Sequence, residues 1–119
     1  MAEARVLVVG LDPALIEGWD PAPVLAAIAR GRARFDELGI GADWCLVDLD
    51  QDPEGAIVAA LTSGNHACVV IGGGIRKHEP LLEFFETVIN LVRRHAPDAA
   101  IAFDSTPEDC ADAALRWLR

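Results

Sequence analysis

The chain has 119 residues, of which 52% are hydrophobic, and its formal net charge is −9 from 19 acidic and 10 basic residues. This length is typical of one domain with its own core, so we expect a single domain over residues 1–119. The charge disfavours nucleic acid and anionic lipid as partners, and no apolar run approaches the roughly 18 residues of a membrane span.

The first residues and the cysteines indicate the compartment. The N-terminal residues lead directly into an apolar run without the pattern of a secretory signal. The three cysteines have no regular spacing, which fits reduced thiols better than a disulfide framework. We therefore expect a cytoplasmic location.

Four apolar runs rich in β-branched residues alternate with helical patterns. These runs have strand lengths and lie at residues 5–9, 43–49, 67–71 and 99–103. The alternation βαβαβαβα predicts a parallel sheet. With right-handed crossovers, the strand order 2-1-3-4 follows, with helices on both faces, as in flavodoxin-like folds. The sequence thus predicts a single-domain α/β fold around a four-stranded parallel sheet.

A proline marks the start of each expected helix, at the first helical position where a missing amide hydrogen costs nothing. The four prolines are Pro21, Pro53, Pro80 and Pro107. Three of them follow good capping residues, namely Asp20, Asp52 and Thr106. Thr106 and Asp109 also resemble a capping box.

The helical patterns differ in the width of their apolar surface. In residues 21–38 the stripe is narrow, and Gly31 within it predicts close packing on the sheet. In residues 80–94 about half the circumference is apolar. This wide face, in residues 81–92, needs a second neighbour, either a helix in the same layer or the partner in a homodimer.

Glycines and cations follow the third strand, where open α/β sheets bind ligands. Residues 67–71 are followed by Gly72, Gly73 and Gly74, and then, after Ile75, by Arg76 and Lys77. The glycines would let the backbone approach a ligand with no side chain between them. This pattern predicts a binding site.

The strand order places the reversal point of the sheet between strands 1 and 3, so Gly10 and Asp12 would lie opposite the glycines. Arg76 can fork onto a phosphate or carboxylate, while Asp12 orients a hydroxyl, a metal or Arg76 itself. Lys77 would add charge. The alternative is an ordinary solvated ion pair between Asp12 and Arg76.

Cofactor motifs are missing from both turns. The glycine turn lacks the closing Gly-Lys-Ser/Thr of a P-loop, and Gly-Leu-Asp-Pro-Ala after strand 1 lacks dinucleotide-binding glycines. Glu79 also places negative charge where a helix-bound phosphate would lie. We therefore expect no NAD, ATP or other cofactor.

Other polar and aromatic residues have two interpretations each. Trp19 could stack on a ligand from a lid or pin its loop against the domain. Asp48, Asp50 and Asp52 could hold a divalent cation, but Asp52 is expected to cap a helix, and we predict no metal site. Asp104 and Ser105 could contact a ligand from the far side of the crevice or form hydrogen bonds within a local turn, and the local turn is favoured.

Three segments carry a resemblance over most of the chain. They are Val-Val-Ile-Gly-Gly-Gly-Ile-Arg, Phe-Glu-Thr-Val-Ile-Asn and Ala-Pro-Asp-Ala-Ala-Ile-Ala-Phe. Together they resemble small bacterial α/β proteins of uncharacterised function. The layout is similar to receiver domains, but Gly72 stands where that family carries its phosphoacceptor aspartate, and no fifth strand is expected. It is similar to flavodoxins too, but Leu-Asp-Pro-Ala-Leu replaces their phosphate loop, so FMN is not expected.

Two hypotheses of function follow. The first is a small anionic ligand, phosphate or carboxylate, bound by the residues at the ends of strands 1 and 3. The second is a regulatory or assembly module without catalysis, which forms a homodimer through the helix of residues 80–94. The sequence contains no recognisable catalytic nucleophile, so it does not decide whether the protein is an enzyme.

Overall fold

The computed structural model describes residues 5–15, 18 and 20–118. The strands are β1 (Arg5–Leu11), β2 (Gly41–Val47), β3 (Cys68–Ile71) and β4 (Ala100–Phe103). The helices are α1 (Ala22–Leu38), α2 (Pro53–Thr62), the single turn α3 (Gly73–Arg76), α4 (Leu82–His95) and α5 (Cys110–Leu115). Short 3₁₀ turns are η1 (Pro13–Leu15), η2 (Glu79–Leu81) and η3 (Pro107–Asp109).

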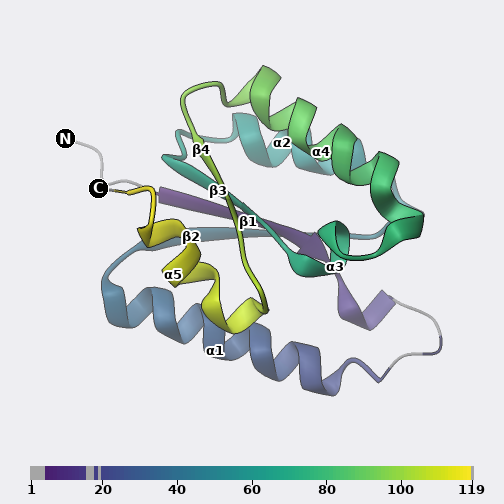
Figure 1. Cartoon of the computed structure of the whole chain (residues 1–119), viewed down its shortest axis with the longest axis horizontal. Helices are drawn as coiled ribbons and strands as arrows, with labels where there is room; N and C mark the ends of the chain where they lie inside the picture. The colour runs from purple at the N-terminus through teal and green to yellow at the C-terminus, as the bar shows by residue number, and fades with distance from the viewer. Residues whose placement is uncertain (1–4, 16–17, 19, 119) are drawn as a thin grey trace.

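The four strands form one parallel sheet in the order β2-β1-β3-β4, which confirms the predicted topology. Helices α1 and α5 cover one face, and α2 and α4 cover the other (Figure 1). Alternate residues of β1 enter the two cores. Val6 and Val8 lie with Phe35 on the α1 side, and Leu7 and Val9 lie on the α2 and α4 side.

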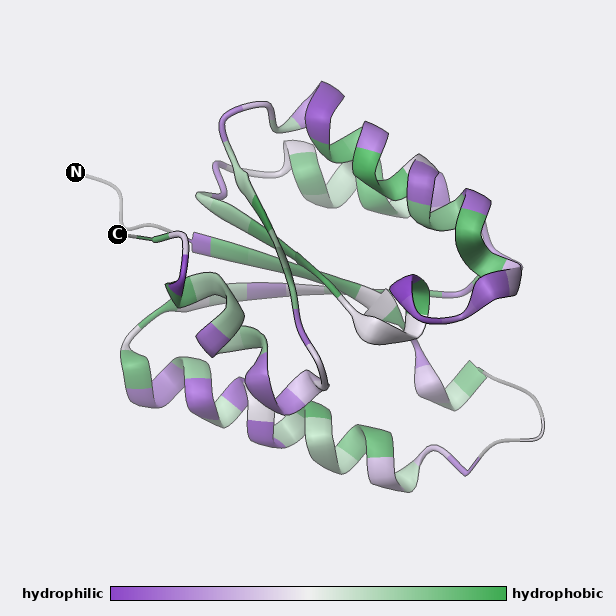
Figure 2. Ribbon diagram, viewed as in Figure 1, coloured by the Kyte–Doolittle hydropathy of each residue, from purple (hydrophilic) through white to green (hydrophobic). Residues whose placement is uncertain are grey.

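Hydropathy follows this three-layer arrangement. Apolar residues dominate β1 and β3, while polar residues recur along the helices (Figure 2). All four residues of β3 are buried because strands pair with both of its edges and helices cover both of its faces. Among the described residues, no helix is both long and apolar enough to span a bilayer.

The proline pattern locates the helix starts to within a few residues. Pro53 is the first residue of α2, and the Asp52 carboxylate accepts a hydrogen bond from the Gly55 amide at 3.1 Å. Pro21 immediately precedes α1. Pro80 and Pro107 lie in 3₁₀ turns instead, so α4 and α5 begin later than predicted. A tight first turn is a common way to enter an α-helix.

Gly31 permits a close contact, but its neighbour differs from the prediction. A Cβ atom at this position would lie 2.2 Å from the main-chain oxygen of Pro107. Helix α1 therefore packs closely on η3, which the chain supplies after β4, rather than on the sheet at this point. Ion pairs from Arg30 to Glu108 and from Arg34 to Asp112 flank the contact.

The wide apolar face of α4 has a neighbour in its own layer. Helix α2 packs beside α4, and Val88 and Val92 are fully buried between them and the sheet. Phe85 and Ile89 are partly buried, while Leu82 at the start of the helix is exposed. The adjacent helix thus accounts for part of this surface, and the homodimer stays a prediction.

Candidate functional site

The glycine segment after β3 coils into one helical turn. Gly72 keeps the extended conformation of the strand, and its amide donates to the Val9 carbonyl at 2.8 Å. From Gly73 the chain turns into α3, with the Lys77 amide donating to the Gly73 carbonyl at 2.8 Å. The segment is therefore a compact turn that projects Arg76 and Lys77 at the carboxyl edge of the sheet.

Asp104, directly after β4, organises this turn from a neighbouring strand. Its carboxylate accepts a hydrogen bond from the Gly73 amide at 3.0 Å, and the residue is only 3% exposed. Burial raises the pKa of the Asp104 carboxyl to about 6, although the Gly73 hydrogen bond and the nearby cations act in the opposite direction. Asp104 thus connects the end of β4 to α3 across 31 residues instead of closing the local turn that the sequence favoured, and its contact with a ligand stays a prediction.

Arg76 and Lys77 both turn toward the end of β4. Arg76 Nη2 donates to the main-chain oxygen of Asp104 at 2.7 Å, and Lys77 Nζ donates to that of Ser105 at 2.7 Å. The Arg76 guanidinium also lies 5.6 Å from the centre of the Phe103 ring. Within the described part of the chain, neither cation forms an ion pair within 4.0 Å.

Asp12 has different neighbours. Its carboxylate accepts from the Ala14 amide at 3.0 Å, and its own amide donates to the Val47 carbonyl at 2.9 Å. No hydrogen bond or ion pair joins Asp12 to Arg76 among the described residues. The sequence predicted that Asp12 and Arg76 would lie opposite each other. In the structure, Asp12 contacts the end of β2, whereas Arg76 contacts the residue after β4.

The hollow at this edge also lies toward β2. It has a volume of about 290 Å³, and Asp12, Asp48 and Asp50 line it together with apolar residues that include Leu11 and Leu49. The three carboxylates make it acidic. No group of three or more acidic, histidine or cysteine side chains is placed to hold a metal ion in the described ranges. Gly72 to Lys77 do not line this hollow.

Trp19 lies outside the described residues, so its stacking or pinning role stays a prediction. Burial raises the pKa of the Cys68 thiol to about 11 and that of Cys110 to about 12. For Cys110, desolvation by burial is the larger cause and the nearby Asp104 carboxylate is the second.

The opposite, amino edge of the sheet holds a second polar arrangement. His66, just before β3, is buried, and its Nε2 lies 2.9 Å from Oδ2 of Asp43 on β2. Arg5 on β1 forks onto the same carboxylate, with contacts at 3.1 and 2.8 Å. The hydrogen bond from Arg5, followed by that from His66, lowers the pKa of the Asp43 carboxyl to about 2.

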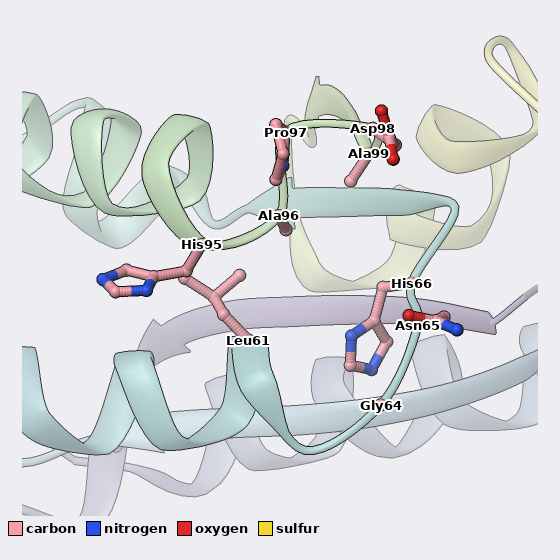
Figure 3. A pocket seen from close by; sticks show the side chains of 9 residues that line it. All are labelled: Leu61, Gly64, Asn65, His66, His95, Ala96, Pro97, Asp98 and Ala99. Carbon is pink, nitrogen blue, oxygen red and sulfur yellow. The ribbon is translucent and has the colours of Figure 1, made fainter.

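A cavity of about 340 Å³ adjoins His66 (Figure 3). The loop from α2 to β3 and the loop from α4 to β4 form its walls, with Leu61, Asn65, His95 and Asp98 among the lining residues. Asp43 and His66 are 23 residues apart, and no short motif connects them.

The strand order and the alternation of strands and helices define a doubly wound parallel α/β protein with a flavodoxin-like layout. Polar groups lie at both ends of β3. Comparisons with protein-family models, curated proteins and solved structures found no match to this chain. The resemblance to small bacterial α/β proteins therefore stays a prediction, and the function rests on the geometry of the chain itself.

Proposed function

We propose that the protein binds a small anionic ligand, a phosphate or a carboxylate, at the carboxyl ends of β1 and β3. The observation that carries the proposal is the pair of cations beside the glycine turn. Arg76 and Lys77 donate to neutral main-chain oxygens rather than to carboxylates. Their charges therefore stay available in a chain whose net charge is −9.

Space beside the backbone supports an approach at Gly74. A Cβ atom there would have as its nearest contact Leu11 Cδ1, at 3.9 Å. The other glycines are closer to their surroundings. A Cβ atom on Gly10 would lie 3.4 Å from the Leu46 side chain, and a Cβ atom on Gly72 would lie 3.2 Å from the Val9 main-chain oxygen. We therefore assign the ligand to the Gly74 side of the turn, with Gly10, Gly72 and Gly73 holding the strands and α3 together.

Asp104 limits the chemistry of this site. Its carboxylate already occupies the Gly73 amide, so the ligand would take donors from the Arg76 guanidinium, the Lys77 ammonium and exposed backbone. With Asp104 and Asp109 ionised, their two negative charges balance the positive charges of Arg76 and Lys77. The anion would therefore be held by charge-assisted hydrogen bonds from the two cations and not by a surplus of local positive charge. The three cysteines are free thiols, which supports our proposal that the protein acts in the cytoplasm.

Thermal unfolding with inorganic phosphate and with small carboxylates, at constant ionic strength set with sodium chloride, tests the proposal. At about 100 times its dissociation constant, a ligand adds roughly 2.7 kcal/mol, which raises Tm by several degrees in a domain of this size. We expect that shift in the wild type and its loss in Arg76→Ala.

Arg116→Ala is the matched control. Arg116 Nη2 donates to the Phe103 main-chain oxygen at 3.0 Å, so this variant also removes a guanidinium contact with the end of β4. It should keep the ligand shift. An equal shift in folded Arg76→Ala and wild type, or no shift with any anion, would contradict the proposal.

A homodimer is the second candidate, and an exposed apolar patch favours it. Leu82 is 56% exposed and Phe103 is 39% exposed, and the Phe103 ring lies 5.9 Å from that of Phe85, one turn of α4 from Leu82. We propose that a second copy of the chain covers this patch.

Sedimentation over a wide concentration range tests the homodimer. The wild type should form a concentration-dependent dimer, which Leu82→Glu should abolish because it places a charge within the apolar contact. Leu25→Glu is the control, since Leu25 is 44% exposed on α1. A wild type that is monomeric throughout, or that dimerises equally in both variants, would contradict this candidate.

A further inference from the structure

Strand β4 leaves its outer edge open. Among the described residues, only β3 pairs with it. In Figure 1 the strand lies in front of β3 and β1, and no element is drawn over it. Edge strands are usually protected from further pairing by charged side chains, proline or bulges. The sequence of β4 is Ala-Ile-Ala-Phe, so the strand carries neither a charge nor a proline.

The register of β4 determines which of its main-chain groups point outward. The Ala100 amide donates to the carbonyl of Ala67, the residue before β3, at 2.9 Å. Hydrogen bonding to one neighbour alternates along a parallel strand, so Ala100 and Ala102 bond to β3. Ile101 and Phe103 therefore direct their main-chain N–H and C=O groups toward the open edge.

Two groups along this edge already have partners. Arg116 Nη2 donates to the Phe103 carbonyl at 3.0 Å. The amide of Ala99, the residue before β4, donates to the Ala96 carbonyl at 3.0 Å. In the part of the chain that the structure describes, the groups left free along the edge are the Ile101 N–H and C=O, the Phe103 N–H and the Ala99 C=O.

The free groups are complementary to those of a second copy of the chain. When two β4 strands lie antiparallel about a twofold axis at Ile101, each Ile101 N–H meets the Ile101 C=O of the second copy. Each Phe103 N–H then meets the Ala99 C=O of the second copy. The Phe103 C=O and the Ala99 N–H, which have partners already, fall opposite each other. This pairing therefore forms new hydrogen bonds without breaking any that the fold contains.

Charges beside the edge are complementary in the same arrangement. Each copy has a net charge of −9, so association is favoured where opposite charges meet. Arg116, at the Phe103 carbonyl, would lie next to Asp98 of the second copy, because Asp98 precedes Ala99. Arg116 and Asp98 are both exposed, and within the described ranges neither forms an ion pair within 4.0 Å.

We propose that two copies of the chain associate by antiparallel pairing of their β4 strands, which joins their sheets into one continuous sheet. This inference rests on the homodimer proposed above and specifies how the two copies pair. Phe103 belongs both to β4 and to the exposed patch with Leu82, so the same pairing covers the patch beside the strand.

Amide hydrogen exchange, measured by NMR at concentrations well below and well above the dissociation constant of the dimer, tests the pairing directly. The Ile101 and Phe103 amides should exchange roughly tenfold or more slowly in the dimer, because each gains a hydrogen bond. The Ala100 and Ala102 amides should be protected at both concentrations, since they bond to β3. Equal exchange of the Ile101 and Phe103 amides in monomer and dimer would overturn the pairing.

A proline at the centre of the edge provides a second test. Ile101→Pro removes an outward N–H and leaves the hydrogen bonds to β3 in place, and edge strands tolerate proline in this orientation. Sedimentation should show a monomer at concentrations where the wild type is a dimer. Ile101→Val keeps the N–H and is the matched control, which should dimerise like the wild type.

Reversal of the two charges tests the register of the pairing. Arg116→Glu and Asp98→Arg should each weaken the dimer by roughly tenfold, because each places like charges side by side at both ends of the paired strands. The double variant should regain most of the wild-type affinity. Absence of this rescue would overturn the register, and the result stands whether or not Ile101→Pro folds.

The same measurements separate this inference from the homodimer itself. A dimer that Leu82→Glu abolishes, but that persists in folded Ile101→Pro and leaves the edge amides exposed, would refute the strand pairing and leave the homodimer in place. A wild type that is monomeric throughout would refute both.

Discussion

Asp104 shows how one buried carboxylate can organise a turn at a cost in stability. It accepts from the Gly73 amide, while the main-chain oxygen of the same residue accepts from Arg76. The side chain and backbone of a single residue thus tie β4 to α3. Because the carboxyl is 3% exposed, ionising it inside the fold is less favourable than ionising it in water.

Asp104 should make the protein more stable in mild acid. Its pKa is about 6 in the fold against 3.8 ordinarily, so the folded state binds the proton more tightly than the unfolded state. This contribution is fully present below the ordinary pKa and is lost as pH rises through 6. Between about pH 7.5 and about pH 4.5 it amounts to about 2 kcal/mol. Urea unfolding at the two pH values measures it as the difference between wild type and Asp104→Asn.

Asp104→Asn is informative because the amide oxygen can still accept from Gly73, yet it does not titrate. The variant should be at least as stable as wild type near neutral pH and lose its advantage in mild acid. A stability difference that is the same at both pH values would show that Asp104 does not titrate in this range.

The candidate site illustrates what sequence can and cannot provide at the scale of single residues. The run from Gly72 to Lys77 could be assigned to the carboxyl edge because ligand positions in parallel sheets follow from strand order. The partners of Arg76 could not, since they are main-chain oxygens after β4, and any residue type can supply such an oxygen. The Asp43–His66 contact was equally hidden, because its partners lie on β2 and before β3, with β1 between them.

At the scale of elements, the contact between α1 and η3 depends on the missing side chain of Gly31. In Gly31→Ala, the new Cβ would meet the Pro107 oxygen at 2.2 Å, and because that atom is main chain, α1 or η3 must move. We expect a net loss of about 2 kcal/mol, since overpacking outweighs the gain in helix propensity. Chemical denaturation followed by circular dichroism measures this loss.

Gly64→Ala is the control for this substitution. A Cβ atom at Gly64 meets nothing within 4 Å, so its stability should change by less than about 0.5 kcal/mol. Equal stability of Gly31→Ala and wild type would mean that α1 and η3 separate freely.

Element positions were predictable where a local rule governs them. Asp52 and Pro53 begin α2 as expected because a cap and a first-position proline act within one turn. The start of α4 was predicted less closely. Pro80 begins no α-helix but lies within η2, and the turn α3 was not predicted at all. The first amide of that turn, Gly73, donates to the Asp104 carboxylate, which is 31 residues away in sequence.

At the scale of the whole molecule, strand order was predictable because it follows from general rules of handedness and connection. The coverage of α4 was left open between a helix and a second copy, and the structure provides α2 as a neighbour. Leu82 and Phe103 remain exposed at one end of that layer. The sedimentation experiment above therefore concerns a patch at the carboxyl edge, not the whole helix face.

Strand β3 has a mechanical consequence for the polar groups beyond its two ends, Arg76 at one edge of the sheet and His66 at the other. A signal passing from Arg76 to His66 along the strand would require β3 to slide past its neighbours. Its four residues are paired with β1 on one side and β4 on the other, and all four are buried. Sliding would break the hydrogen bonds with both neighbouring strands at once, so β3 is held in a fixed register. A change of side chain at one edge should therefore leave the backbone geometry of the other edge undisturbed.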